Sequence, residues 1–130
     1  MKHILETKTI HASGVCFEKK GVLILGKSGS GKSSLALSLV ANGAQLVCDD
    51  RAQLQMKNKI LMMTKPPSLP GALEVRGLGF ISVPLITEAR VDLIIDMELT
   101  SDSRLGGHKM ELFGVEIPCV KGKNFYGLSD

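Results

Sequence analysis

The sequence has no tryptophan and few aromatic residues of any kind. Aromatic residues make up 4% of the 130 positions, whereas apolar residues make up 44%. A folded core must therefore be aliphatic, and leucine, valine and isoleucine dominate the apolar runs. Such runs suit a sheet layered against helices. The length is that of one domain, and we expect residues 1–130 to form a single domain.

Cysteine is scarce as well. Cys16, Cys48 and Cys119 are odd in number and widely separated, so they form neither a disulfide framework nor a zinc-binding spacing. Reduced thiols are typical of cytoplasmic proteins, and we expect a cytoplasmic location. We expect all three thiols to be small, buried hydrophobic groups.

Long apolar stretches and concentrated charge are also missing. No apolar run approaches the ~20 residues of a membrane span, and residues 1–8 lack the apolar segment of a signal peptide. The net charge is only +3, and the basic residues are spread along the chain. Because nucleic-acid binding requires a concentrated basic face, we expect no nucleic-acid partner and no membrane partner. A small anionic ligand fits this charge better.

The apolar runs predict an α/β domain with a mixed sheet and few helices. The expected strands are residues 7–15, 22–25, 46–48, 53–56, 60–64, 91–95, 109–113 and 115–120, and the expected helix is 32–42. Residues 22–48 follow the order strand, loop, helix, strand, which is a βαβ-like unit. Gly43 stands where a helix C-terminal cap belongs.

One segment matches a complete phosphate-binding motif, the P-loop. Residues 26–33, GKSGSGKS, fit G-x-x-x-x-G-K-[ST], follow an apolar strand and open a helix. Glycines in this motif allow backbone conformations that let N–H groups converge on phosphate oxygens. Lys32 would reach the β- and γ-phosphates, and the Ser33 hydroxyl would bind Mg²⁺. The predicted cofactors are therefore ATP and Mg²⁺. The predicted nucleotide-binding residues are Gly26, Lys27, Ser28, Gly29, Ser30, Gly31, Lys32 and Ser33.

Carboxylates at strand ends are the next candidates for chemistry. Asp49 and Asp50 end the strand after the helix, where open α/β sheets bind ligands. Because adjacent strand residues point to opposite faces, one could act as a base and the other could hold metal or water. A solvated turn explains the pair equally well. Asp96 also ends a buried strand, where a capping role is favoured over metal binding, and the lone His11 favours a structural role.

Four motifs occur in one order along the chain. They are HASGV at 11–15, GKSGSGKS at 26–33, LVCDD at 46–50 and LEVRGLGFI at 73–81. Together they resemble the catalytic domain of HPr kinase/phosphorylase. LEVRGLG is similar to that family's signature and is far more specific than the P-loop. The resemblance covers roughly residues 7–124.

The resemblance implies a fold and a set of site residues. The fold is a mixed β-sheet P-loop domain similar to that of phosphoenolpyruvate carboxykinase. Asp50 would take the proton from a substrate serine, and Glu74 would join Ser33 as a metal ligand. An arginine at the transferring phosphate makes physical sense, since a guanidinium grips phosphoryl oxygens bidentately. The implied catalytic residues are His11, Lys32, Asp50 and Arg104.

Three features depart from the family pattern. We expect a short form of the family without its usual N-terminal domain, as found in some proteobacteria, and the given sequence ends soon after the late loop at residues 118–124. That loop has Val120 and Lys123 where the family has arginines. Because the loop is tied to phosphorolysis, the reverse reaction is the activity most affected. In the family, the segments beyond this loop serve substrate docking and assembly of a hexamer. The resemblance therefore implies a homo-oligomer.

The leading hypothesis is a bacterial serine kinase that uses ATP and Mg²⁺ and acts on HPr or an HPr-like phosphocarrier of a phosphotransferase system. The second is a nucleotide-sensing regulatory module that binds ATP and a signalling partner without productive transfer. A small-molecule P-loop kinase would carry more helices and a lid. A transporter-type ATPase would be longer and would carry a Leu-Ser-Gly-Gly-Gln stretch, which this sequence lacks.

Overall fold

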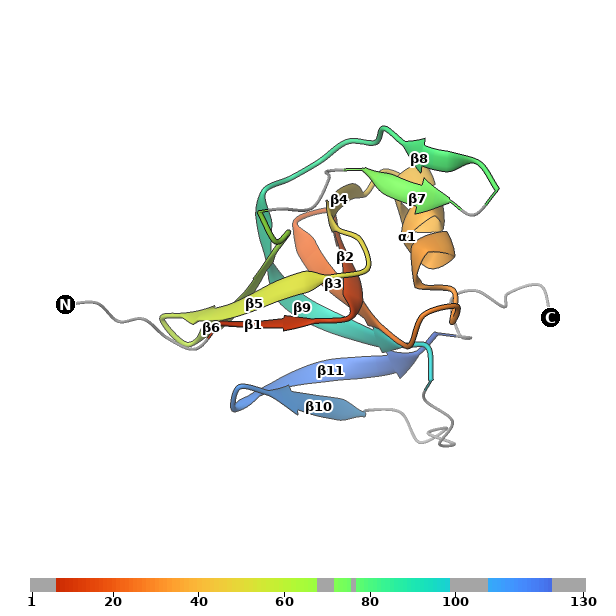
Figure 1. Ribbon diagram of the computed structural model, residues 1–130. Helices are drawn as coiled ribbons and strands as arrows, with labels where there is room; N and C mark the ends of the chain where they lie inside the picture. Colours follow the sequence, from red (N-terminus) through yellow and green to blue (C-terminus); the bar gives the residue numbers. More distant parts are fainter. Residues whose placement is uncertain (1–6, 68–71, 76, 99–107, 123–130) are drawn as a thin grey trace.

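The structure, a computed structural model, describes residues 7–67, 72–75, 77–98 and 108–122. These ranges form one mixed sheet of nine strands, a separate two-stranded sheet and one helix (Figure 1). The helix is α1 (Lys32–Ala41). The strands are β1 (Thr7–Ile10), β2 (Ala12–Phe17), β3 (Lys20–Leu25), β4 (Gln45–Cys48), β5 (Ala52–Lys57), β6 (Ile60–Thr64), β7 (Leu73–Val75), β8 (Gly79–Ile81), β9 (Glu88–Asp96), β10 (Lys109–Leu112) and β11 (Val115–Lys121).

The longest strand, β9, holds the sheet together. Its residues 91–96 pair in parallel with β3 on one edge. On the other edge, residues 88–90 pair antiparallel with β6 and residues 94–96 pair in parallel with β11. The sheet order is β1-β5-β6-β9-β3-β2-β4, with the β10–β11 hairpin attached to β9. The predicted mixed sheet with few helices is therefore confirmed for these residues, which form a sheet-dominated domain with one helix.

Three hairpins build most of the sheet, and all of them turn through left-handed backbone. Two successive residues with positive φ, as in a type I′ turn, match the right-handed twist of the paired strands. The pairs are Glu18 and Lys19, Asn58 and Lys59, and Phe113 and Gly114, with φ between 49° and 80°. The predicted hairpins over residues 53–64 and 109–120 are thereby confirmed.

One sequence prediction is wrong. Residues 7–15 were expected to form a single strand, but the chain bends at His11 and forms β1 and β2. The reason is that the two strands have different partners. β1 pairs with β5 near one end of the sheet, whereas β2 inserts between β3 and β4. The bend therefore lies where two parts of the sheet meet.

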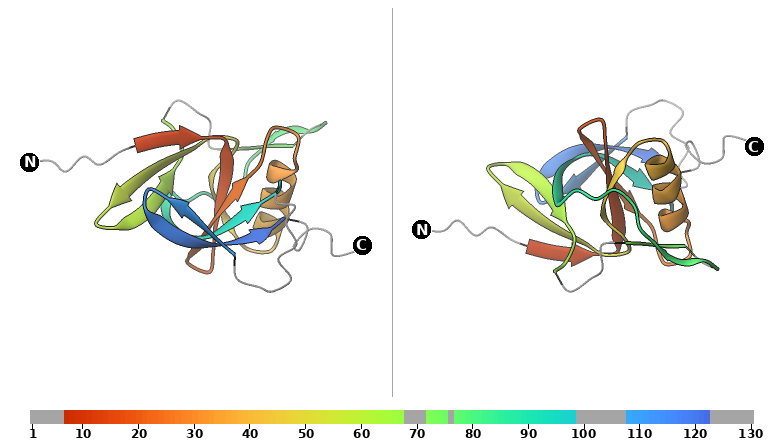
Figure 2. Two further views of the ribbon diagram at one scale, coloured as in Figure 1. Left: turned by 90° about the horizontal axis from the view of Figure 1, so that it is seen from below. Right: turned by 90° about the horizontal axis from the view of Figure 1, so that it is seen from above.

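The helix lies at the end of the sheet away from β1, β5 and β6 (Figure 2). It connects β3 to β4, which are separated by β2, so the predicted βαβ-like unit is a crossover that skips one position. Its end has the hydrogen bonds of a Schellman motif, with the Gly43 N–H donating to Val40 O and the Ala44 N–H donating to Leu39 O, both at 3.0 Å. Gly43 has φ 108°, so its prediction as the cap residue is confirmed.

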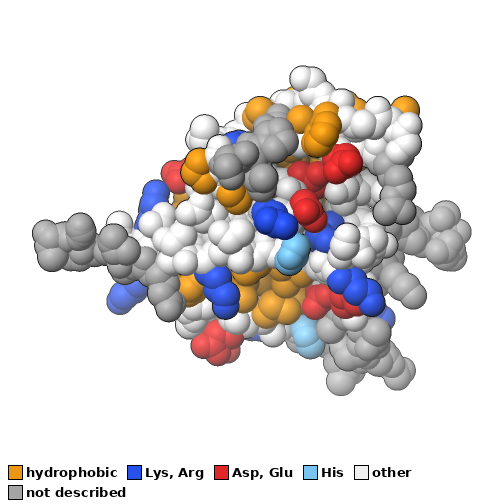
Figure 3. Space-filling model, in the orientation of Figure 1, with side chains coloured by type: hydrophobic (Ala, Val, Ile, Leu, Met, Phe, Trp, Pro, Cys, Tyr) orange, Lys and Arg blue, Asp and Glu red, His pale blue; other side chains and the backbone are white. Residues whose placement is uncertain are grey.

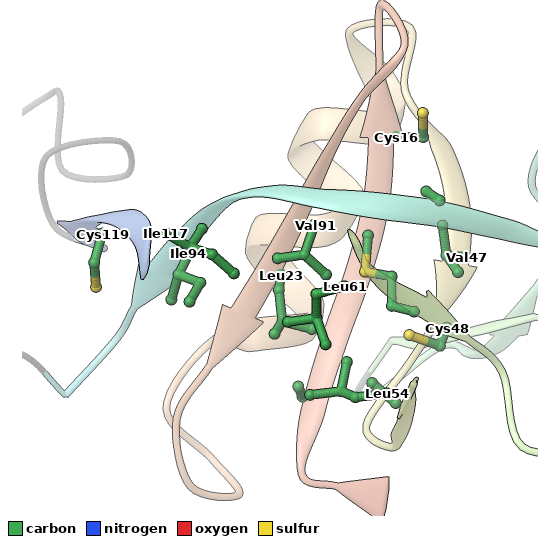
Figure 4. Packing of buried hydrophobic residues seen from close by; sticks show 14 residues of the cluster. Cys16, Leu23, Val47, Cys48, Leu54, Leu61, Val91, Ile94, Ile117 and Cys119 are labelled. Atoms are coloured by element: carbon green, nitrogen blue, oxygen red, sulfur yellow. The ribbon is translucent and has the colours of Figure 1, made fainter. Parts of the chain in front are cut away.

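The core is aliphatic and sulfur-containing, as the composition predicted. Leu35 and Ala36 of α1 pack with Val15, Ile24 and Ile95 on one face of the sheet. A second cluster fills the other face (Figure 4). The three cysteines are free and buried, which confirms their expected role as small hydrophobic groups. No helix in the described ranges has the length and apolar character of a membrane span.

Gly21, at the start of β3, tests how closely β3 and β9 are packed. A Cβ added there would overlap the carbonyl oxygen of Arg90, which belongs to the central strand. We expect Gly21→Ala to lower the free energy of unfolding by ~2–3 kcal/mol, because the backbone of β9 must move. Urea denaturation would measure this, with Gln45→Ala, at the exposed first position of β4, as the control. Equal stability of both variants would contradict the packing.

Candidate functional site

The loop between β3 and α1 has the backbone conformation that its glycines permit. Gly26, Gly29 and Gly31 have φ values of 153°, 85° and 103°, which side chains rarely tolerate. The Ser30 N–H donates to Lys27 O at 3.0 Å and tightens the loop. At Gly26 a side chain would also clash with Ser30 Oγ and Met97 Cβ. The loop conformation therefore follows from three glycines at fixed spacing.

The loop ends at a helix N-terminus that carries no neutralising group. Gly31 is the N-cap and offers no side chain, and the first turn of α1 contains no acidic residue. The first helical hydrogen bond runs from the Leu35 N–H to Gly31 O at 3.0 Å. The N–H groups before it have no partner within a helix and carry the positive end of its dipole. This end can accept an anion.

Lys32 adds a full positive charge at the same place. Its side chain is buried, with 5% of its surface exposed, although it carries an ammonium group. Nζ donates to the carbonyl oxygen of Lys27 at 3.1 Å, so the side chain folds back over the loop. A buried lysine is costly without an anionic partner. Its position inside the loop suits a bound phosphate.

Asp49 joins four segments of the chain. Its Oδ1 accepts the hydroxyl of Ser33 at 2.8 Å and the hydroxyl of Ser13 at 2.9 Å. Its Oδ2 accepts the backbone N–H of Glu74 at 3.3 Å. These contacts bring β2, α1 and β7 to the end of β4. A carboxylate that accepts several hydrogen bonds is fixed in orientation, and it fixes its donors in turn.

Asp50, the next residue, is in a different environment. Its side chain is exposed, and its backbone has φ 68°, in the left-handed region. Two hydrogen bonds hold that backbone: the Asp50 N–H donates to Ser13 Oγ at 3.1 Å, and the Ala12 N–H donates to Asp50 O at 3.2 Å. The adjacent carboxylates are therefore in different environments, and their separate roles stay a prediction. Asp49 faces the helix, and Asp50 faces solvent.

These groups surround one pocket of about 380 Å³. Acidic, basic and histidine side chains gather over β2 and β4 on the face drawn in Figure 3. The β7–β8 hairpin lies over α1 and forms part of the wall (Figure 1). The lining residues are Ser28, Gly29, Gly31, Lys32, Ser33, Ser34, Asp49, Asp50, Glu74 and Val75.

The predicted site residues fall into three groups. Ser28, Gly29, Gly31, Lys32, Ser33, Asp50 and Glu74 line the pocket together. Gly26, Lys27 and Ser30 lie in the same loop without lining it, and His11 is exposed at the bend next to Ala12, which bonds to Asp50. Arg104 lies outside the described residues, as does Lys123. Asp96 accepts the Glu98 N–H at 2.8 Å through Oδ1, the capping role that its sequence favoured.

The pocket atoms that could bind a metal ion are oxygens. The Ser33 hydroxyl, with Asp49 behind it and the exposed Glu74 carboxylate on β7, forms a set that suits a hard cation such as Mg²⁺. No group of three or more His, Cys, Asp or Glu side chains able to hold a metal occurs among the described residues. Mg²⁺ needs no such cage, because it is commonly held by one or two carboxylates together with substrate phosphates. The residues therefore fit Mg²⁺ bound with a nucleotide.

A family model described as the HPr Serine kinase C-terminal domain matches residues 2–126 of the chain. The chain belongs to this family. The match spans the loop, both aspartates and the β7–β8 hairpin. The predicted recognition is thus confirmed, and the fold is that of the HPr serine kinase C-terminal domain, a sheet-dominated domain with one helix in its described part.

A solved structure supports the same conclusion. The chain is similar to the HPr(Ser) kinase/phosphatase from Coxiella burnetii, with 30% sequence identity and a TM-score of 0.75. The similarity covers 88% of this chain and 78% of that one. The structural likeness therefore extends over nearly the whole HPr kinase domain described above.

Two features of this HPr kinase domain were missed from sequence. The signature stretch was assigned no secondary structure, yet it forms the β7–β8 hairpin through Gly77 and Gly79, whose φ values are 89° and 95°. Ser13 was not singled out, although its hydroxyl bonds to Asp49. The G-L-G spacing is a turn signal that could have revealed the hairpin. A serine within a strand carries no comparable signal.

The buried thiol of Cys48, next to Asp49 in the chain, makes the stability of the fold depend on pH. Burial, with a smaller contribution from the Asp49 carboxylate, raises the pKa of its thiol from 9.0 to about 12. A pKa raised by folding means that the neutral thiol stabilises the fold fully below pH 9. That stability is lost as the pH rises from 9 toward 12.

We expect the free energy of unfolding of wild type, relative to Cys48→Ala, to fall with a slope of up to ~1.4 kcal/mol per pH unit above pH 9. Other groups that titrate in this range cancel in the difference between the two proteins. Chemical denaturation at several pH values would measure it. Parallel stability curves for the two proteins would contradict the burial of the thiol.

Proposed function

We propose that this protein is an ATP- and Mg²⁺-dependent serine kinase that phosphorylates HPr or an HPr-like phosphocarrier of a bacterial phosphotransferase system. Family membership supports the reaction class, and the similar structure from Coxiella burnetii carries the name HPr(Ser) kinase/phosphatase. The observation that carries the proposal is the shared pocket. Lys32 and Ser33 line it from the first turn of α1, Glu74 lines it from the hairpin, and the exposed Asp50 lines it as well.

The loop and helix residues would bind the nucleotide. The glycine-rich backbone and the first turn of α1 offer N–H groups to phosphate oxygens. Lys32 places its ammonium against the β- and γ-phosphates. Ser33 and Glu74 would hold Mg²⁺, and Asp49 keeps the Ser33 hydroxyl oriented through their 2.8 Å hydrogen bond. Mg²⁺, when bound there, would offset the negative charge of the phosphates.

Asp50 would act as the base. Its carboxylate takes the proton of the substrate serine hydroxyl, and the serine oxygen forms a bond to the γ-phosphorus. The bond from that phosphorus to the β,γ-bridging oxygen breaks, and ADP leaves with the electron pair. A base that must meet the serine of another protein has to be exposed, and Asp50 is. Most of the acceleration would come from positioning and charge stabilisation.

The remaining parts of the proposal rest on the family resemblance. His11 would assist at the rim beside Asp50, and Arg104 would contact the transferring phosphoryl group. Reverse phosphorolysis is the activity that the residue at position 120 affects most. Val120 packs against the core in β11, where it pairs with Ile95. The family's arginine at this position would supply a cation that this chain does not have. We also propose a cytoplasmic location and a homo-oligomeric assembly for this protein.

The same substitution at Val120 supports one alternative, a nucleotide-sensing module that binds ATP and a signalling partner without transfer. Incubation with Mg²⁺, γ-labelled ATP and purified HPr separates the two. A label that becomes stable on a carrier serine supports the kinase. Measurable ATP binding without labelled carrier, over a panel of HPr-type proteins, supports the sensing module.

We expect Asp50→Asn to lose transfer to the carrier by at least ~100-fold, because no base remains for the serine hydroxyl. ATP affinity should change little, since Asp50 does not belong to the nucleotide-binding loop. Steady-state transfer and calorimetric ATP titration would measure the two effects. Glu116→Gln, an exposed carboxylate on β11, is the matched control. Full transfer by Asp50→Asn would remove Asp50 from the mechanism.

We expect Lys32→Met to weaken ATP binding by ~10–100-fold, because charge-assisted hydrogen bonds to phosphate contribute about 1.5–3 kcal/mol. Methionine keeps most of the buried volume. Lys27→Met is the control, since Lys27 is exposed in the same loop and does not line the pocket. Calorimetric titration with ATP would compare them. Equal losses for both variants would show that charge in the loop, rather than the position of Lys32, determines binding.

A further inference from the structure

Ser13 is an unusual residue for its position. Among the residues that the structure describes, the buried polar or charged side chains are Ser13 and Lys32, with 0% and 5% of their surface exposed. Lys32 has a role in the proposed chemistry. Ser13 has none assigned, and it lies within β2 between the small residues Ala12 and Gly14. An alanine would fill almost the same space there.

The Ser13 hydroxyl makes two hydrogen bonds, one to each of the paired aspartates. It donates to Asp49 Oδ1 at 2.9 Å and accepts the Asp50 N–H at 3.1 Å. A hydroxyl has one proton and two lone pairs, so the two bonds are compatible. Asp49 Oδ1 also accepts the hydroxyl of Ser33. The buried Ser13 oxygen is thus bonded both to the carboxylate of Asp49, which orients Ser33, and to the backbone of Asp50, the proposed base.

The backbone around this contact needs such a restraint. Asp50 has φ 68°, and the pairing of β2 with β4 shifts register between Gly14 and Val15. Irregular pairing of this kind re-aims side chains and often lies beside active sites. A left-handed conformation at a non-glycine residue persists only where its surroundings determine it. The Asp50 backbone is held on its N–H by Ser13 and on its carbonyl by Ala12.

We propose that Ser13 is a positioning residue for both Asp49 and Asp50. Its one hydroxyl would fix the orientation of Ser33, through Asp49, and the direction in which the Asp50 carboxylate points. This role rests on the proposed kinase function for its effect on rate. The positioning itself is independent of activity. Without the hydroxyl, the Asp50 N–H is left unpaired, and Asp49 loses the donor that opposes Ser33.

The test compares Ser13→Ala, which lacks the hydroxyl, with Ser13→Thr, which keeps it. Ser38→Ala, at an exposed position of α1, is the control. In ¹⁵N-labelled protein without nucleotide, Ser13→Ala should shift the amide signals of Asp50 and Glu74 together. Glu74 is distant in sequence, but its N–H donates to Asp49 Oδ2 at 3.3 Å. In transfer from ATP to purified HPr, kcat should fall by ~10–100-fold in Ser13→Ala, with little change in the KM for ATP. Ser13→Thr should restore most of it.

Three results would overturn this role. The first is a Ser13→Ala protein with wild-type kcat and unmoved Asp50 and Glu74 amides. The second is an equal loss of kcat in Ser13→Thr, which would assign the effect to packing. The third is a Ser13→Ala chain that does not fold, since the hydroxyl would then be a requirement of the fold. If wild type itself does not transfer phosphate to HPr, the proposed function fails, and the amide shifts still decide the positioning role.

Discussion

The site depends on the carboxylate of Asp49. It accepts the hydroxyls of Ser13 and Ser33 and the backbone N–H of Glu74, and these donors come from β2, α1 and β7. The sheet carries β2 and β4, and the apolar cluster that contains Leu35, Leu46 and Leu73 packs α1 and β7 against β4. Asp49 adds the polar link between these elements. Because the ligand-facing residues lie on separate elements, the hydrogen bonds of Asp49 help to fix their relative positions. Catalytic groups need positions defined to within a fraction of an ångström, which makes such a junction valuable.

Charge in the pocket has two signs. Lys32 and the uncapped start of α1 favour an anion, whereas Asp49, Asp50 and Glu74 line the same space with carboxylates. A phosphate group alone would meet repulsion from the acidic side. A divalent cation between them resolves the conflict, since its charge reverses the local electrostatics. The proposed nucleotide and Mg²⁺ together therefore match both signs of charge, whereas either alone would match one.

Local patterns were sufficient to predict much of the fold. The helix, its glycine cap and the hairpins over 53–64 and 109–120 follow from periodicity, glycine spacing and polar turns. The strand break at His11 could not be predicted, because it arises from the different partners of β1 and β2. A turn over residues 18–21 is predictable from its polar residues and Gly21, but nothing in Glu18 and Lys19 indicates their left-handed backbone.

For the site, the motif predicted Lys32 and Ser33, and the strand-end position made Asp49 and Asp50 candidates. The resemblance then assigned the role of base to Asp50 and added Glu74. What sequence could not provide was contact across distance. Ser13 and Asp49 are 36 positions apart, and their hydrogen bond exists only because β2 and β4 are neighbours with an irregular register. Arg104 stays a prediction, since it lies outside the described residues.

The most direct test of the site is a crystal structure with Mg²⁺ and a non-hydrolysable ATP analogue. We predict that the β- and γ-phosphates lie against the N–H groups of residues 29–33 and the Lys32 ammonium. Mg²⁺ should lie between those phosphates, the Ser33 hydroxyl and Glu74. An analogue bound elsewhere on the domain, or Mg²⁺ held without Ser33 and Glu74, would contradict the account.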